Sequence, residues 1–544
     1  MKNSAAMVGR QNRDAEVVSA DWLSGSDPMD PNVIGFNVKS TASETFDPEV
    51  PPTPLNLSQD TLIDEIVKHL GKSSAALGAV PHILVQVHGF NNPPDVSLVR
   101  YQQAFETLKT QKHPAGLVYL GYDWPSEQAM EPGFPLKLVP PLLPVATLLL
   151  VLVTAVIWAG YGRTSIAIAY LIPAILGVIV FGAIAVAGKA NAMGLIKAVM
   201  IGLLIPLAFP LLGMTALFLM PIVLLLRGIV YFRDQYRAIH YGVVDLVDLL
   251  RKLDYRLKDT YSNVGHQGRD PVRLSFIGHS MGAFVTVNIV RILTDVFNVD
   301  SIATNRGRDE SKLDRIGNTL KLQNLVLVSP DLPTENVLSG RSNYVASSLH
   351  RFSRCFLFSN EADEVVNLIS GTAHSFSLPY RTSRFGVRLA NLSLFRENKH
   401  YGCLTSQTPW SAGVWTTKET LATLDATQHP IAEQFTILDC TDATDVLTIW
   451  RTVRGAEIAQ NPSKTKRVLS PRLSGIFVSN GHINMLGHFL ALSTYIWRYD
   501  LHSGYFDARF IRETIFGVAA SSSGWMPDCA ELKDHQIAML QATR

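Results

Sequence analysis

The sequence Gly-His-Ser-Met-Gly at residues 278–282 contains the side chain best suited to chemistry, the hydroxyl of Ser280. It follows an apolar, β-branched run at 271–277, and a helix-like pattern of apolar residues continues from 283 to 293. Glycines on both sides of a serine suit a tight, strained turn from a strand into a helix, which leaves the hydroxyl exposed above the sheet. The backbone N–H of Met281 would then face a developing oxyanion, so the pattern predicts a serine nucleophile.

A serine nucleophile at such a turn needs an acid and a histidine base, which follow it along the chain in that order. Asp363 is the preferred acid, because it lies in a polar loop just after the apolar run at 354–358. Asp331, which follows a similar run at 322–328, is an alternative, and Glu361 is another. Asp331 also suits a turn or a helix cap in its Pro-Asp-Leu-Pro context.

Three histidines late in the chain are candidates for the base: His482, His488 and His502. His482 precedes an apolar, helix-like segment at 483–497, and His488 lies within it. A histidine in such a segment is more often part of a core or a surface than a catalyst. His502 is preferred because it lies in a short polar loop, where catalytic residues are usually found.

A second oxyanion donor is expected from the loop after an early strand, and the sequence His88-Gly89-Phe90 follows the apolar run at 82–87. We expect the N–H groups of Phe90 and Met281 to form the oxyanion hole. Glycine at position 89 lets the backbone approach a substrate oxygen closely, whereas His88 itself is expected to be structural.

Short apolar runs that alternate with helical patterns position these side chains. The strand-like runs are 82–87, 116–120, 271–277, 322–328, 354–358 and 434–438, and helical patterns cover 96–109, 236–257, 283–293 and 508–516. Strands alternating with helices predict an α/β fold with a mostly parallel sheet.

The motifs HGFNN, WPS, GHSMG, LVLVSPD, FLFSNEADEVV and HSGYF occur in that order. In this the chain resembles the α/β-hydrolase superfamily, and more narrowly a bacterial esterase/lipase-like family of unknown function that carries HGFNN and GHSMG. The resemblance covers roughly 81–126 and 236–516. It implies Ser280 as nucleophile, Asp363 as acid, and a C-terminal histidine in an H-S-x-Y-like context, which favours His502.

The composition excludes several classes of protein. Among 544 residues, 48 Lys and Arg nearly balance 46 Asp and Glu, for a net charge of +2. This gives no sign of the strongly basic face of a nucleic-acid-binding protein, and it excludes an acidic disordered chain. Four cysteines are too few for a disulfide scaffold, and no CxxC pair, Walker sequence or HExxH spacing is present, so no cofactor or metal is expected.

Charged residues make up only 17% of the chain, below the roughly 25% of typical soluble proteins, because one segment is almost wholly apolar. Between residues 138 and 226 the charged residues are Arg163, Lys189 and Lys197. The stretches 138–160 and 165–188 are each long enough to span a bilayer. The stretch 194–230 contains Pro206, Pro210 and Pro221, and fits either one broken helix or a pair of spans.

The predicted oxyanion loop precedes this block and Ser280 follows it, so both must lie on one side of the membrane. We therefore expect an even number of crossings, two or four, with four favoured. Lys137, Lys189, Lys197 and Arg227 flank the spans on one side, which the positive-inside rule assigns to the cytoplasm.

The expected organisation has four parts, with two late insertions. They are a polar N-terminal arm at 1–55, with a possible edge strand near 32–38, a first hydrolase part at 56–136, a membrane block at 137–232, and a second hydrolase part at 233–544 with insertions near 381–430 and 450–497. The resulting hypothesis is a membrane-anchored serine hydrolase of apolar or lipid-like esters, in the cell's inner membrane and facing the cytoplasm, with the lipid bilayer as a partner. The alternative is a non-catalytic membrane scaffold or binding protein with a hydrolase-like domain. A transporter fits less well, since the spans lack acidic residues.

Overall fold

The central feature of the computed structural model is a large, mostly parallel β-sheet flanked by helices. The structure describes residues 16–42, 54–77, 80–126, 229–263, 271–293, 315–337, 348–370, 388–394, 401–404, 414–415, 434–459, 467–468, 478–491 and 501–541, with short gaps inside several of these ranges. Nearly all of them belong to one compact unit. The predicted α/β architecture is confirmed.

Six neighbouring strands form most of the parallel core of the sheet. In spatial order they are β13 (Thr436–Asp439), β9 (Arg354–Ser359), β8 (Leu320–Val328), β6 (Val272–His279), β4 (His82–Val87) and β5 (Leu117–Asp123). These correspond to the six predicted strand runs. Since β6, β8 and β9 are adjacent and parallel, the residues that follow them gather at one edge of the sheet.

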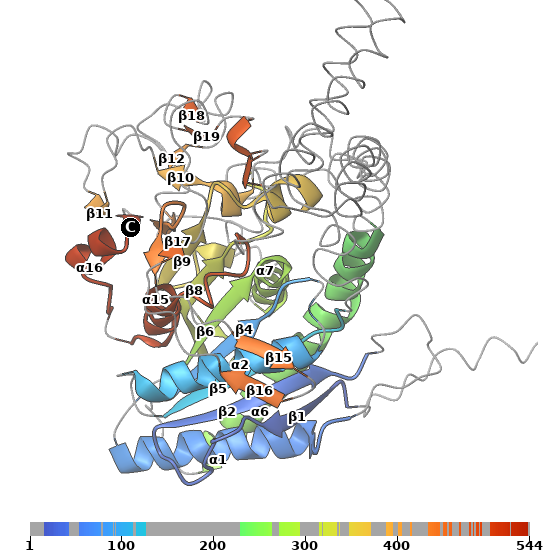
Figure 1. Ribbon diagram of the computed structural model, residues 1–544. Helices are drawn as coiled ribbons and strands as arrows, with labels where there is room; N and C mark the ends of the chain where they lie inside the picture. The colour runs from blue at the N-terminus through green and yellow to red at the C-terminus, as the bar shows by residue number, and fades with distance from the viewer. Residues whose placement is uncertain are drawn as a thin grey trace, which may run out of the picture. The chain divides into compact units, whose positions relative to one another are not determined.

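Helices cover both faces of this sheet (Figure 1). On one face α1 (Gln59–Leu77), α6 (Val243–Asn263) and α7 (Met281–Leu293) pack together, and on the other α2 (Pro94–Thr110) packs with α15 (Arg509–Ala520). The alternation along β4 explains the two cores: Ile83, Val85 and Val87 enter the first, and Leu84 enters the second.

The N-terminal region contributes strands to the sheet. β2 (Val33–Ser40) pairs in parallel with β5 and in antiparallel with β1 (Val18–Trp22), which also pairs with β3 (Leu57–Ser58). The expected edge strand near 32–38 therefore lies inside the sheet and is covered on both sides. The short pattern within a polar segment did not reveal these pairings, because they depend on residues about eighty positions away in β5.

The predicted membrane block lies almost wholly outside the described residues, which resume at 229. No helix in the described part of the chain is both long and apolar enough to cross a membrane. The ends of the interruption meet: the Ser126 hydroxyl donates a hydrogen bond of 3.0 Å to the Asp234 carboxylate. β4, which precedes the interruption, pairs directly with β6, which follows it. One sheet is thus built from both sides of the block.

The late part of the chain adds small elements. β11 (Gly402–Leu404), within the expected insertion at 381–430, joins the main sheet by pairing with β20 (Ala538–Leu540). A disulfide between Cys403 and Cys529 links β11 to α16 (Cys529–Asp534). This pairing was not predicted, since the two cysteines are 126 residues apart in the sequence. In the expected insertion at 450–497, β15 (Trp450–Val453) pairs with β16 (Ala456–Ala459), and β18 (Val478–Ser479) with β19 (His482–Ile483).

Candidate active site

Ser280 occupies a sharp turn between β6 and α7. Its backbone φ of 54° lies in the left-handed region that side chains rarely adopt. The flanking glycines are required by contact: a Cβ at Gly278 would lie 2.6 Å from the Cα of Ala283, and one at Gly282 would lie 2.3 Å from the carbonyl oxygen of Val87. The predicted strained strand-to-helix turn is therefore present, and only glycine fits at positions 278 and 282, two residues before and after the serine.

The loop after β4 lies directly against this turn. A Cβ at Gly89 would be 2.7 Å from the Cβ of Ser280 and 3.2 Å from its hydroxyl oxygen. Of the two expected oxyanion donors, Phe90 follows this glycine in the same loop, and Met281 is the first residue of α7. The loop and the turn meet even though the predicted membrane block separates them in the sequence.

His88 is part of the support of this loop. The Trp124 indole N–H donates to the carbonyl oxygen of His88 at 2.8 Å, and the two rings stack with centroids 5.3 Å apart. The His88 Nδ1 lies 2.6 Å from the carbonyl oxygen of Gly89, and its Nε2 lies 2.8 Å from the Asp123 carboxylate. These contacts engage both ring nitrogens of His88 and agree with its expected structural role.

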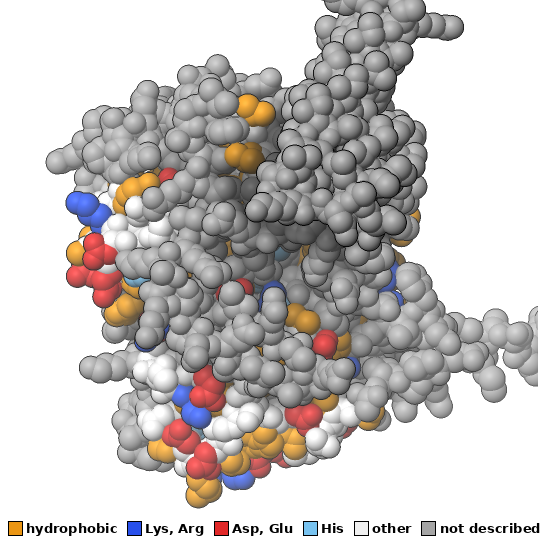
Figure 2. All heavy atoms as spheres, viewed as in Figure 1, with side chains coloured by type: hydrophobic (Ala, Val, Ile, Leu, Met, Phe, Trp, Pro, Cys, Tyr) orange, Lys and Arg blue, Asp and Glu red, His pale blue; other side chains and the backbone are white. Residues whose placement is uncertain are grey.

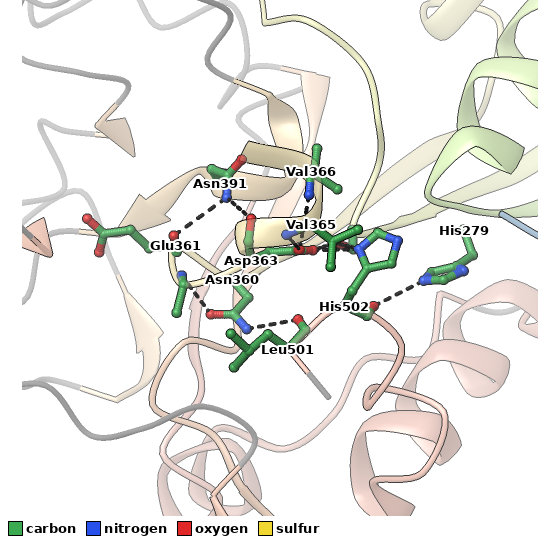
Figure 3. A network of polar contacts seen from close by, with 11 residues as sticks. His279, Asn360, Glu361, Asp363, Val365, Val366, Asn391, Leu501 and His502 are labelled. Atoms are coloured by element: carbon green, nitrogen blue, oxygen red, sulfur yellow. Dashed lines mark hydrogen bonds and ion pairs between the residues drawn. The ribbon is translucent and has the colours of Figure 1, made fainter. Parts of the chain in front are cut away.

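Asp363 and His502 form a buried pair. The carboxylate Oδ2 of Asp363 lies 2.8 Å from Nδ1 of His502, although 139 residues separate them in the sequence (Figure 3). Asp363 is completely buried, and its other oxygen accepts hydrogen bonds from the backbone N–H groups of Val365 and Val366 at 3.2 and 3.4 Å. The pair leaves Nε2 of His502 as the nitrogen that can exchange a proton with a substrate or a nucleophile.

The acid–histidine pair and Ser280 lie at the same edge of the sheet. The backbone N–H of Ser280 donates to the carbonyl oxygen of Val328, the last residue of β8, at 3.1 Å. The next residue, Ser329, donates its backbone N–H to Phe358 of β9. Asp363 follows β9, so the ends of three neighbouring parallel strands bring the serine turn and the acid loop together.

The other candidate acids have different partners. Asp331 accepts a hydrogen bond of 2.8 Å from the Tyr231 hydroxyl, and its second oxygen lies 3.6 Å from the guanidinium of Arg388. Glu361 accepts from the backbone N–H of Ile483 at 2.9 Å. Both acids therefore support loops around the edge of the sheet, whereas the carboxylate that contacts Nδ1 of His502 belongs to Asp363.

The other candidate bases are also placed elsewhere. Nδ1 of His488 lies 2.5 Å from the carboxylate of Glu364. Burial lowers the pKa of His488, but the hydrogen bond and charge of Glu364 raise it by more, so the net shift is upward. His482 belongs to the backbone of β19, which pairs with β18. His488 is thus paired with Glu364, and the side chain of His482 lies outside the described residues.

Ser329 is a residue that the sequence reasoning did not single out. Its hydroxyl donates to the Asp363 carboxylate and lies 3.3 Å from Nδ1 of His502, so it contacts both members of the pair. It is fully buried and, like Ser280, has a positive φ, of 43°. Its place at the end of a predicted strand, in the sequence Ser-Pro-Asp, was the available signal.

His279, the residue before the serine, was also missed. Its Nε2 lies 3.1 Å from the carbonyl oxygen of His502, which fixes the backbone of the loop that holds the base. Burial, together with the neighbouring charges of His502 and Arg100, lowers the pKa of His279 well below its usual value. It is therefore a neutral imidazole whose Nε2–H donates to that carbonyl.

Within the described ranges, no three or more His, Cys, Asp and Glu side chains gather as metal ligands would. Comparisons with protein-family models, with curated proteins and with solved structures found no match for this chain. The arrangement of Ser280, Asp363, His502 and Gly89 must therefore be judged by its own geometry. Chemically it presents a serine hydroxyl on a strained turn against a backbone loop, at the same edge of the sheet as a histidine that a buried carboxylate orients.

Proposed function

We propose that this chain is a serine hydrolase with an α/β-hydrolase domain, which cleaves carboxylic esters in the manner of an esterase or a lipase. The observation that carries the proposal is the buried contact of 2.8 Å between Asp363 and Nδ1 of His502, at the edge of the sheet where Ser280 occupies its strained turn. A carboxylate that accepts a hydrogen bond from Nδ1–H makes Nε2 the nitrogen that accepts a proton, which is the function of a triad histidine.

In the proposed reaction, the Ser280 hydroxyl attacks the acyl carbon while Nε2 of His502 takes its proton. The carbonyl π electrons move to oxygen, and the N–H groups of Phe90 and Met281 stabilise the resulting oxyanion. When the tetrahedral intermediate collapses, the ester C–O bond breaks and the alcohol leaves with the proton from His502. Water, deprotonated by His502, then attacks the acyl-enzyme and releases the acid and free Ser280.

The nucleophile is tested by covalent labelling of the full chain with a fluorophosphonate probe. We expect wild-type protein to be labelled and Ser280→Ala not to be labelled. A matched control is Ser275→Ala, another buried serine of β6, whose hydroxyl contacts His82 at 2.8 Å; it should retain labelling. Absence of labelling in folded wild-type protein would reject the enzyme and favour a scaffold or binding protein with a hydrolase-like domain.

Membrane anchoring is part of the proposal. The block at 137–232 supplies an even number of spans, because the Ser126–Asp234 hydrogen bond and the β4–β6 pairing require both flanks to be on one side. Cysteines introduced at two exposed positions, Asp60→Cys and Lys258→Cys, test this with a membrane-impermeant maleimide. Both should react from the same side of the membrane. Reaction from opposite sides would exclude the shared site.

The proposed side is the cytoplasm, on the basis of the flanking Lys and Arg residues. The disulfide between Cys403 and Cys529 weighs in the other direction, since such bonds persist mainly in oxidising compartments. The same maleimide experiment, carried out on intact cells and on permeabilised cells, decides between the two sides. Reaction only after permeabilisation would indicate the cytoplasm, and reaction in intact cells the outer side.

The proposed substrates are apolar or lipid-like esters, because an anchored enzyme meets them at the bilayer. Among the described side chains on the face drawn in Figure 2, basic ones lie among acidic ones and do not form a separate patch, in keeping with the net charge of +2. We do not propose a nucleic-acid partner, since such binding depends on a concentrated basic surface.

A further inference from the structure

A long helix follows the predicted membrane block and presents an apolar face to the outside. It begins with helical residues 229–237, continues through a π-helical turn, η2 (Ala238–Gly242), and ends with α6 (green in Figure 1). Beyond Ile229 at its start, which is also exposed, five exposed apolar side chains lie along its first half: Phe232, Tyr236, Ile239, Tyr241 and Val244, which we call the juxtamembrane face. They are between 39% and 57% exposed, and they extend for about 18 Å along the helix.

The chemistry of the exposed side changes abruptly along the same helix. Between residues 231 and 244, the other fully exposed position is His240, whose ring lies against that of Tyr236 at 4.1 Å. From Asp248 onward the outward positions are largely charged, and include Arg251, Lys252, Arg256 and Lys258. An ordinary solvent-exposed helix would carry such polar residues along its whole length. The apolar half is the half that adjoins the membrane block.

The opposite side of this half is fixed to the protein, so the helix cannot rotate to bury the juxtamembrane face. Tyr231 is buried, and its hydroxyl donates to Asp331 at 2.8 Å. The carboxylate of Asp234 is buried, and it accepts from Ser126 at 3.0 Å and from the guanidinium of Arg233 at 2.8 Å. The inward residues Tyr231 and Asp234 are therefore held in place by hydrogen bonds to other parts of the protein.

From these observations we infer that the juxtamembrane face lies in the lipid–water interface of the bilayer. The chain before residue 229 is an apolar run that begins at 138, so this helix starts where the last proposed span ends. Tyrosine rings gather at the headgroup level beside a span, and phenylalanine is common on the apolar face of interfacial helices. The helical stretch 231–244, with one apolar face and no charged residue among its fully exposed positions, is suited to lie in that layer.

The inferred contact has a consequence for the site, which rests on the proposed function. The ring of Tyr231, on the inward side of the helix, packs edge-on against Phe90 with centroids 5.8 Å apart. Phe90 belongs to the loop that abuts Ser280. Contact of the helix with lipid therefore places the oxyanion loop one helix diameter from the headgroups, about 10 Å, where a lipid-like ester could reach Ser280.

The inference is tested with the full chain in nanodiscs of phosphatidylcholine and phosphatidylglycerol. A fluorophore is attached at Tyr236→Cys or, as a second position, at Val244→Cys, and some lipids carry a nitroxide near the headgroup. The control is Tyr255→Cys, a tyrosine of the same helix with 62% exposure in its charged half. The natural cysteines do not interfere, since Cys355 and Cys440 are buried and the other two are paired.

We expect the nitroxide lipids to reduce the fluorescence at Tyr236 and Val244 at least about twofold, while the Tyr255 label responds only to aqueous iodide. If iodide quenches all three labels equally and the nitroxide lipids do not, the face lies in water and the inference is wrong. Shielding of the Tyr236 and Val244 labels from both quenchers would also overturn it, because protein, from this chain or a second copy, would then cover the face. Fluorophosphonate labelling of the same samples reports separately on the proposed enzyme, so the two can fail independently.

Discussion

The substitution Asp363→Asn gives a sharp test of the acid–histidine pair. Both oxygens of this buried carboxylate accept hydrogen bonds: Oδ2 from His502 and Ser329, and Oδ1 from the backbone N–H groups of Val365 and Val366. Asparagine has the same shape, but its NH₂ group would replace one of the two oxygens. In one orientation it faces the donors of His502 and Ser329, and in the other it faces the backbone N–H groups of Val365 and Val366. The change therefore preserves packing while it removes one acceptor from a fully buried site.

The conflict is relieved at lowest cost when the NH₂ group faces His502 and the imidazole changes tautomer. Its Nδ1 then accepts and its Nε2 carries the proton, so it can no longer take a proton from Ser280. Loss of the correct tautomer in a serine triad lowers the rate by about 10⁴, which corresponds to about 5 kcal/mol in the activation free energy. We expect a decrease of this order in the second-order rate constant for fluorophosphonate labelling, with a nearly unchanged thermal unfolding midpoint.

Glu364→Gln is the matched control, because Glu364 is the next residue and its carboxylate contacts another histidine, His488, at 2.5 Å. If the reaction depends on the Asp363–His502 pair, Glu364→Gln should stay within about threefold of wild type. Folded Asp363→Asn protein that is labelled within tenfold of the wild-type rate would refute the reasoning. So would equal losses in the two variants, because they would indicate that the whole loop, and not one hydrogen bond, controls the serine.

The remaining predictions concern Ser329, the serine turn and one buried carboxylate. Ser329→Ala removes a hydrogen bond to a charged group, and it should slow labelling about tenfold and change its pH profile without unfolding the protein; an unaltered rate and profile would show that the hydroxyl has no positioning role. Gly282→Ala places a Cβ against the carbonyl oxygens at the end of β4, and it should destabilise the fold by about 3 kcal/mol or more. The control Gly71→Ala lies in open space on helix α1, and it should be neutral or stabilising by up to about 1 kcal/mol. Equal unfolding midpoints for the two variants would contradict the packing argument. Burial raises the pKa of Asp245 from 3.8 to about 7, so between these values the unfolded chain ionises while the folded protein does not, and stability should fall as the pH rises through this range and level off above it. Asp245→Asn should remove this decline, which amounts to a few kcal/mol, in thermal unfolding measured from pH 4 to pH 8, and a decline of the same size in the variant would exclude Asp245 as its source.

The local parts of the site were predictable because they depend on neighbouring residues in the sequence. A β-branched run, a glycine on each side of Ser280 and a helical pattern are contiguous, so they predict the turn without knowledge of the rest of the chain. The position of Asp363 just after a strand is a local signal of the same kind. The six parallel strands were recognisable because each is a short apolar run between loops.

Other features were decided only by tertiary contacts. The sequence favoured His502 over His482 and His488 only by its loop context, and the pairing of Asp363 with His502 joins positions 139 residues apart. The contacts of Ser329 and His279 have no periodic signature, because each depends on where the ends of β6, β8 and β9 bring their loops. The interior position of β2 and the link between Cys403 and Cys529 depend in the same way on partners far along the chain.

The sequence by itself therefore determined which short segments are strands, where the reactive turn forms and that a long apolar block interrupts the domain. The tertiary structure decided which histidine meets which acid, and that both flanks of the block meet at Ser126 and Asp234. The physical reason is that strand and turn preferences arise within a few residues of backbone, whereas a buried hydrogen bond needs two groups brought together by the packing of the whole sheet.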